Sequence, residues 1–120
     1  MQIKSMDPVT LKKRLEEGSA VLIDVREPHE HAREHIEGAK LVPLSRFQAE
    51  NFADLQGKTA VFHCHSGGRT SANAKLLTSK GFREAHHLGG GIVAWKAAGL
   101  PTRSQQQPAG EGRRKLFGLF

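Results

Sequence analysis

Residues 61–71 read Val61-Phe62-His63-Cys64-His65-Ser66-Gly67-Gly68-Arg69-Thr70-Ser71, and this segment, which holds the single cysteine, is the most informative feature of the chain. An apolar run leads into the single cysteine, a short glycine-containing loop follows, and a helical pattern begins near Thr70. Small residues let successive backbone N–H groups turn toward one point, where the positive end of the helix adds to their field. Such a loop stabilises negative charge on sulfur or on a bound oxyanion, so Cys64 is predicted to be a reactive thiolate.

Strand-like and helix-like segments alternate on both sides of this loop. Short apolar runs that are typical of buried strands lie at 20–23, 60–63 and 85–88. Helical patterns lie between and beyond these runs, at about 8–17, 28–34, 70–80 and 92–98. The alternation predicts an α/β fold with a central, mostly parallel sheet that is flanked by helices.

The composition describes a single domain of 120 residues with one cysteine. One cysteine excludes an internal disulfide and leaves no cysteine pair for a structural zinc. The seven histidines suggest a metal site, but no zinc-protease spacing accompanies them. No secretory signal opens the chain and no apolar stretch is long enough to span a membrane. We therefore expect a cytoplasmic protein that holds no metal and no cofactor.

Residues 102–120 differ in character from the rest of the chain. Their composition cannot bury a core, so we expect a folded domain at 1–101 and a flexible C-terminal tail at 102–120. The tail holds four basic residues against Glu111 alone and so contributes half of the net charge of +6. The remaining charge is mild and no aromatic and basic surface pattern accompanies it, which argues against a nucleic-acid partner.

The last residues of the tail, 113–120, are first basic and then apolar. This pattern favours a disordered terminus. The alternative is a contact with a membrane surface, which would place the protein at the inner face of a membrane.

Arg69 closes the cysteine loop with a permanent positive charge, which can bind a sulfonate or a phosphate through paired hydrogen bonds. A loop at the carboxyl end of a parallel strand is also where open α/β sheets bind their ligands. The residues predicted to bind the anion follow the cysteine directly and are His65, Ser66, Gly67, Gly68, Arg69 and Thr70. Asp24 and Arg26 end the first apolar run, and that position predicts a supporting role beside the site.

The loop at 64–70 resembles the active-site loop of rhodanese-like sulfurtransferases, in the form Cys-x-x-Gly-x-Arg-Ser/Thr. Three further segments agree with that family in order and spacing. They are Leu22-Ile23-Asp24-Val25-Arg26-Glu27, His35-Ile36-Glu37-Gly38-Ala39 with Val42-Pro43, and Gly90-Gly91-Ile92-Val93-Ala94-Trp95-Lys96 with Gly99-Leu100-Pro101. The resemblance covers residues 5–101, which is nearly all of the predicted folded part.

The resemblance implies a three-layer domain and a reaction that the composition does not reveal. Cys64 would attack the outer sulfur of an anionic donor such as thiosulfate, expel sulfite and become a persulfide. A thiophilic acceptor would then take that sulfur: cyanide, a small thiol or a protein. The N–H groups of the loop fit both steps, because they can bind the anionic donor and then stabilise the persulfide.

Two alternatives stay open at this point. Cysteine phosphatases and arsenate-reducing relatives use a similar cysteine and arginine, but phosphatases have five residues between the two, whereas four separate Cys64 from Arg69. The shorter loop favours a sulfur substituent over a transferring phosphoryl group. The other alternative is a sulfur carrier or membrane-associated regulatory module. Its function would depend on binding a partner more than on catalytic turnover.

Overall fold

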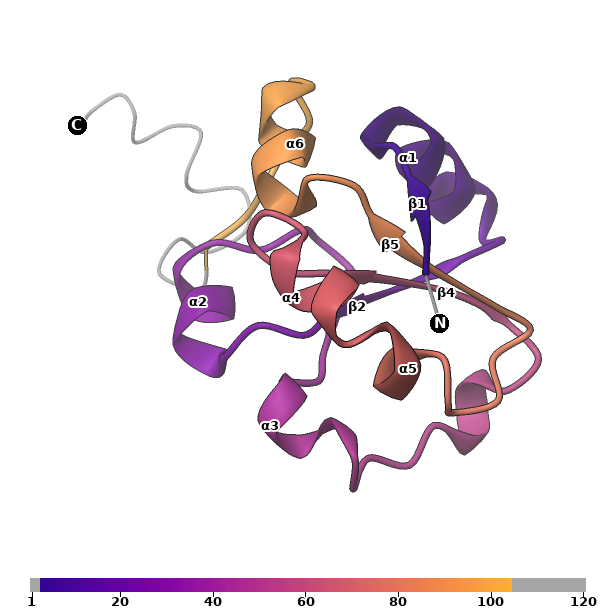
Figure 1. Cartoon of the computed structure of the whole chain (residues 1–120). Coiled ribbons are helices and arrows are strands. Elements are labelled where there is room, and N and C mark those ends of the chain that lie inside the picture. The colour runs from indigo at the N-terminus through magenta and orange to yellow at the C-terminus, as the bar shows by residue number, and fades with distance from the viewer. Residues whose placement is uncertain (1–2, 105–120) are drawn as a thin grey trace.

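The computed structural model of the chain describes residues 3–104. Five strands form one sheet in the order β1-β5-β4-β2-β3, and every neighbouring pair is parallel (Figure 1). The strands are β1 (Lys4–Met6), β2 (Val21–Asp24), β3 (Lys40–Leu41), β4 (Thr59–His63) and β5 (Glu84–Leu88). The parallel sheet with its flanking helices confirms the predicted α/β fold.

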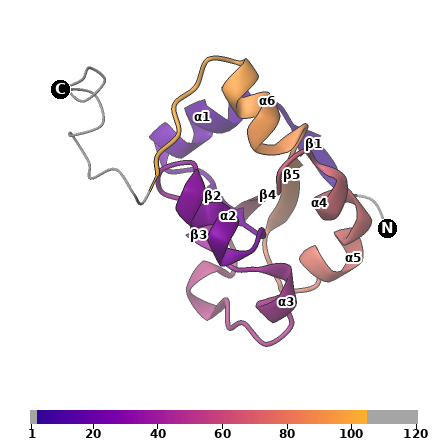
Figure 2. The same ribbon diagram turned by 90° about the vertical axis from the view of Figure 1, so that its left-hand side faces the viewer.

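Helices lie on both faces of the sheet (Figure 2). They are α1 (Pro8–Glu17), α2 (Pro28–Arg33), α3 (Leu44–Phe47), α4 (Gly68–Ala72), α5 (Ala74–Leu77) and α6 (Gly91–Ala97), with a 3-10 turn at Ala53–Leu55. On one face, Leu11 of α1 and Trp95 of α6 join a core cluster with Val61 of β4. On the other face, Phe47 of α3 and Leu77 of α5 pack in a second cluster.

The apolar centre of β4, residues 60–62, follows from the position of this strand inside the sheet. Successive side chains of a strand point to opposite faces, and here Val61 belongs to one cluster and Phe62 to the other. All five residues of β4 are buried. A continuous apolar run is therefore the sequence signature of a strand that is covered on both faces.

The structure differs from the sequence prediction in two strands and in one helix. Strands β1 and β3 were not predicted, because runs of three and two residues are too short to show a pattern, and only Met6 among them is buried. The helix predicted over 70–80 is two helices, since the backbone leaves helical geometry at Asn73 (φ −112°, ψ 25°). The Asn73 Nδ2 group donates to the Arg69 carbonyl at 2.7 Å, and such side-chain bonds to the backbone compete with helix continuation.

The chain leaves the last helix and returns along α2. The backbone N–H of His35 donates to the Arg103 carbonyl at 2.8 Å, and the Arg103 N–H donates back at 2.7 Å. The Thr102 hydroxyl donates to Glu34 Oε2 at 2.7 Å, so the first residues of the predicted tail contact the folded domain. The remainder of that prediction, including the basic and apolar end, lies outside the described residues. No helix within 3–104 is long and apolar enough to cross a membrane.

Candidate active site

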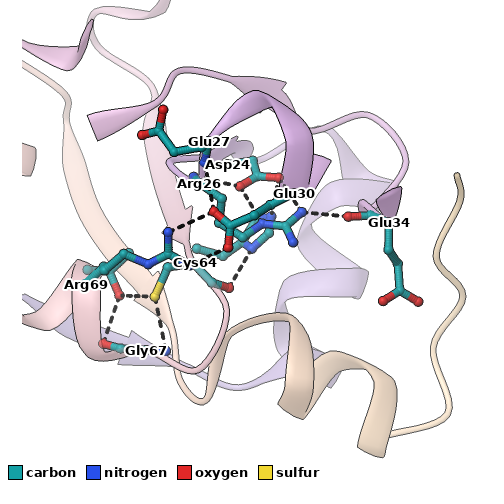
Figure 3. Close-up of polar contacts among 10 residues, drawn as sticks. Asp24, Arg26, Glu27, Glu30, Glu34, Cys64, Gly67 and Arg69 are labelled. Carbon is teal, nitrogen blue, oxygen red and sulfur yellow. Dashed lines mark hydrogen bonds and ion pairs between the residues drawn. The ribbon is translucent and has the colours of Figure 1, made fainter. Parts of the chain in front are cut away.

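Cys64 follows β4 directly, and its loop lies at the carboxyl end of the parallel sheet. The loop turns sharply at Gly67, whose φ of +99° lies in the left-handed region that side chains disfavour, and α4 begins at the next residue. The turn brings the Gly67 N–H within 3.1 Å of the Cys64 sulfur, to which it donates (Figure 3). The loop residues therefore place at least one backbone donor directly on the thiol.

Further donors surround the same sulfur. The Thr70 hydroxyl of α4 lies 3.8 Å from Cys64 Sγ, and Thr70 is fully buried. Burial raises the pKa of the Cys64 thiol, but hydrogen bonds from the backbones of Thr70, Gly67 and Arg69 and from the Thr70 hydroxyl outweigh burial and hold the pKa below its usual value. The site thus favours a thiolate at neutral pH more than an ordinary cysteine does.

The Cys64 loop is held from behind by the start of α6. The Ile92 N–H donates to the Cys64 carbonyl and the Val93 N–H to the His65 carbonyl, each at 3.1 Å. Gly91 makes this contact possible, because a Cβ at that position would lie 2.4 Å from the His65 carbonyl oxygen. Gly91 therefore allows close packing between two backbones.

Arg69 points toward helix α2, where it meets Glu30. Its Nη1 and Nη2 groups donate to the two carboxylate oxygens of Glu30, each at 2.9 Å (Figure 3). The Arg69 hydrogen bonds hold the pKa of Glu30 at about 2, and Glu30 in turn raises the pKa of Arg69. The arginine predicted to bind an anion thus carries a partly neutralised charge and fastens the cysteine loop to α2.

Asp24 and Arg26 form a second pair beneath the loop. Asp24 accepts hydrogen bonds from Arg26 Nε at 2.9 Å and Arg26 Nη2 at 2.8 Å, and also from the Arg26 backbone N–H. Burial raises the pKa of Asp24, but the bonds from Arg26 outweigh burial and lower it overall. Arg26 Nη2 also donates to the Glu34 carbonyl at 2.7 Å, so the pair ties the end of β2 to the end of α2.

His63 is a site residue that the sequence did not reveal. Its ring is fully buried, and Nδ1 lies 3.1 Å from the Cys64 carbonyl oxygen, to which it can only donate. Its Nε2 has no hydrogen-bond partner and lies 3.6 Å from Asp24 Oδ2. Burial lowers the pKa of His63, although the Asp24 charge opposes this. A neutral His63 therefore holds the backbone of the cysteine itself.

The structure brings only some of the predicted residues to the sulfur. Gly67 and Thr70 contact it directly, and Arg69 contributes its backbone. His65, Ser66 and Gly68 are exposed. Arg26 donates to the Glu34 carbonyl at the end of α2, and Asp24 Oδ2 lies 3.6 Å from His63 Nε2.

Sequence reasoning missed Glu30 and His63, and no local motif indicates their contacts. Glu30 is 39 residues from its partner Arg69, and His63 reads as part of an apolar strand. The described residues 3–104 contain no group of three His, Cys, Asp or Glu side chains that could hold a metal.

Comparison with known proteins places these features in a wider group. The family model described as "Rhodanese-like domain" matches residues 7–98. A sulfurtransferase of Allochromatium vinosum is 30% identical over 100 residues, which are 82% of this chain and 94% of that protein. A probable adenylyltransferase/sulfurtransferase MoeZ of Mycobacterium tuberculosis is 42% identical over 94 residues, which are 76% of this chain and 24% of that protein.

Solved structures agree with the sequence comparison. The crystal structure of a thiosulfate sulfurtransferase from Pseudomonas aeruginosa matches with a TM-score of 0.73 at 31% identity, and the match covers 86% of this chain and 20% of that one. The chain spans 24–53% of the length of the curated relatives that it matches at 42% identity.

Proposed function

This chain belongs to the rhodanese-like domain family, and from that membership we propose that it is a sulfurtransferase whose carrier is a persulfide on Cys64. The contact that carries the proposal is the Gly67 N–H on the Cys64 sulfur at 3.1 Å, within a loop of backbone donors. Relatives described as sulfurtransferases support it. The proposed donor is a small sulfane-sulfur anion such as thiosulfate, as in the matching Pseudomonas aeruginosa enzyme's description.

The first half-reaction loads the cysteine. The Cys64 thiolate attacks the outer sulfur of thiosulfate, a sulfur–sulfur bond forms, and the donor's own sulfur–sulfur bond breaks. Sulfite leaves with the bonding electron pair, and Cys64 carries one additional sulfur atom with a negative charge. The backbone donors at Gly67 and Thr70 that lower the pKa of the thiol are placed to stabilise that charge.

The second half-reaction transfers the outer sulfur from Cys64 to an acceptor. A nucleophilic acceptor, cyanide or a thiolate, attacks the outer sulfur of the persulfide, and Cys64 departs as the thiolate that the loop already favours. No proton needs to move at Cys64 in either step. The chemistry therefore requires a stabilised sulfur anion more than a general acid. The hydrogen bonds around Cys64 that lower its pKa would provide that stabilisation.

The enclosure of the cysteine supports a slender donor. Cys64 is only 1% exposed, so little of its surface is open to a reacting group. The outer sulfur of thiosulfate is a single terminal atom, whereas a phosphoryl group brings three oxygens to the nucleophile. The geometry thus agrees with the shorter loop in favouring sulfur transfer over phosphate ester hydrolysis.

Arg69 enters the proposal with a changed role. Because both of its Nη groups are bound to Glu30, we assign it to anchoring the loop and to a moderated positive field. Donor binding then rests chiefly on the backbone N–H groups of the loop.

The test is the intact mass of the protein after incubation with thiosulfate in the absence of reductant. We expect wild type to gain the mass of one sulfur atom and Cys64→Ser to gain none. Subsequent addition of cyanide should restore the original mass and release thiocyanate. Loading of Cys64→Ser, or no loading of wild type, would remove the proposal.

The same samples distinguish the alternatives. A cysteine phosphatase would release phosphate from a chromogenic ester in a reaction that Cys64→Ser abolishes. A sulfur carrier would load normally but return its sulfur slowly to cyanide and small thiols.

A further inference from the structure

The Thr70 hydroxyl lies between the Cys64 sulfur and a histidine on another strand. His87 belongs to β5, and its Nδ1 is 2.7 Å from Thr70 Oγ1, the shortest contact of that hydroxyl. The same oxygen is 3.8 Å from Cys64 Sγ and 3.2 Å from the Gly67 carbonyl oxygen. Thr70 is fully buried, so these three protein atoms are the partners described for its hydroxyl.

The protonation of His87 Nδ1 decides which acceptor receives the proton of the Thr70 hydroxyl. The Thr70 hydroxyl has one proton to donate, and both the sulfur anion and the Gly67 carbonyl accept it. If His87 Nδ1 lacked a proton, it would take the hydroxyl proton through the shortest contact, and the sulfur would face the oxygen lone pairs. If Nδ1 carries its proton, it donates to Thr70 Oγ1, and the hydroxyl proton is left for the other two acceptors.

We propose that His87 is a positioning residue whose Nδ1–H donates to Thr70 and thereby directs the Thr70 hydroxyl toward the Cys64 sulfur anion. The hydrogen bond from His87 to the Thr70 oxygen also polarises the Thr70 O–H bond, which strengthens the hydrogen bond from that hydroxyl to the Cys64 sulfur. The inference deepens the proposed function, because the same hydroxyl would stabilise the thiolate and then the persulfide.

Uncharged residues flank His87 in the sheet. Its neighbours across the sheet are Ser5 on β1 and Phe62 on β4, neither of which carries a charge. From α4 it meets Thr70, and the nearby Arg69 charge is paired with Glu30. Partial burial of the ring lowers the pKa of His87, so it is neutral at pH 7 and acts through its tautomer.

The test measures the Cys64 thiolate without requiring sulfur transfer. The rate of alkylation by iodoacetamide is followed against pH, because only the thiolate reacts. We expect His87→Leu to raise the pKa of Cys64 and to slow alkylation at pH 7 about three- to tenfold, the effect of one lost hydrogen bond. His87→Asn should restore the wild-type profile, since its amide can donate from the same position as Nδ1.

Matched controls separate this role from a general disturbance of β5. His86→Leu makes the same change at the preceding residue, whose ring contacts Glu84, and should leave the profile unchanged. In a Thr70→Val background, His87→Leu should have no further effect on the Cys64 profile, because the intermediary hydroxyl is gone.

The sign of the change decides the outcome. If His87 accepted from Thr70, His87→Leu would free the hydroxyl proton and lower the pKa of Cys64, and the proposal would be wrong. An unchanged profile would overturn it as well. Failure of wild type to load sulfur from thiosulfate would instead count against the proposed function, and the alkylation result would still stand.

Discussion

The Asp24–Arg26 and Glu30–Arg69 pairs are both two-point contacts between a carboxylate and a guanidinium, yet they lie in different surroundings. Side chains of the first pair are 0% and 4% exposed, and those of the second are 25% and 38% exposed. The first joins residues two apart at the end of β2, whereas the second connects α2 to the loop that holds Cys64. We therefore expect the buried pair to stabilise the fold, and the open pair to moderate the positive charge of Arg69 near the Cys64 sulfur.

This difference follows from how solvent acts on each pair. Water screens the open pair, so its net contribution to stability is small. The buried pair is screened little, and either partner left alone would be a charge without water or a counterion. Substitutions in the first pair should therefore change folding, and substitutions in the second should change reactivity.

Asp24→Asn should have the largest effect on stability. It leaves the buried Arg26 guanidinium without a counterion, which should lower the free energy of unfolding by about 3–5 kcal/mol. Urea denaturation at pH 7 measures this. The matched control is Glu37→Gln, which breaks the pair of Glu37 with Arg103, where Glu37 is 72% exposed. Equal losses in the two variants would show that burial does not distinguish the pairs.

His63 should make the buried region sensitive to mild acid. Because burial lowers its pKa below the usual 6.5, the unfolded chain takes up a proton that the folded chain refuses. Stability should fall as pH decreases through 6.5, with His63 contributing up to about 1.4 kcal/mol per pH unit. Urea midpoints between pH 7.5 and about pH 5.5 should show a shallower slope for His63→Asn than for wild type. Parallel slopes would mean that His63 does not carry this proton linkage.

The sequence was sufficient where a feature depends on neighbouring residues. The apolar run of β4, the turn at Gly67 and the helix start after it are local features, and together they predict that Cys64 is the reactive group. Gly91, which lies in one of the sequence segments that resemble the family, packs against this loop, and a Cβ there would lie 2.4 Å from the His65 carbonyl oxygen.

The sequence was insufficient where a side chain selects a distant partner. Nothing local indicates that Arg69 turns to Glu30 instead of an incoming anion, or that His87 reaches Thr70. Asn73 is a residue that a helix tolerates, and only its bond back to the Arg69 carbonyl explains the break. Side-chain partners across the fold follow from packing, which periodicity does not report.

Glu30→Gln should change reactivity more than stability. The substitution removes a negative charge near the anion site and releases part of the Arg69 field, so the KM for thiosulfate should fall about three- to fivefold. The free energy of unfolding should change by no more than about 1 kcal/mol. Steady-state thiocyanate formation measures the KM, with Glu37→Gln as the control. A raised KM would mean that Arg69 serves the donor only while Glu30 holds it in place.

The smallest expected effect is the acid titration of the open pair. The hydrogen bonds from Arg69 lower the pKa of Glu30 from the usual 4.5 to about 2, so the ionised form is favoured in the folded state. That stabilisation is fully present above pH 4.5 and is lost as pH falls toward 2. Urea midpoints of wild type and Glu30→Gln should therefore keep a constant separation from pH 7 to about pH 5.

Below about pH 5 the two urea midpoints should converge. Protonation of Glu30 progressively removes from wild type the stabilisation by Arg69, which Glu30→Gln lacks at every pH. Above pH 5 the free energies of unfolding of the two proteins should differ by no more than about 1 kcal/mol, since both side chains of the pair are partly solvated. A separation that stays constant down to pH 3 would mean that Glu30 is not stabilised as an anion by Arg69. The moderated field that we assign to this pair would then have no basis, and Arg69 would be free to bind the donor directly.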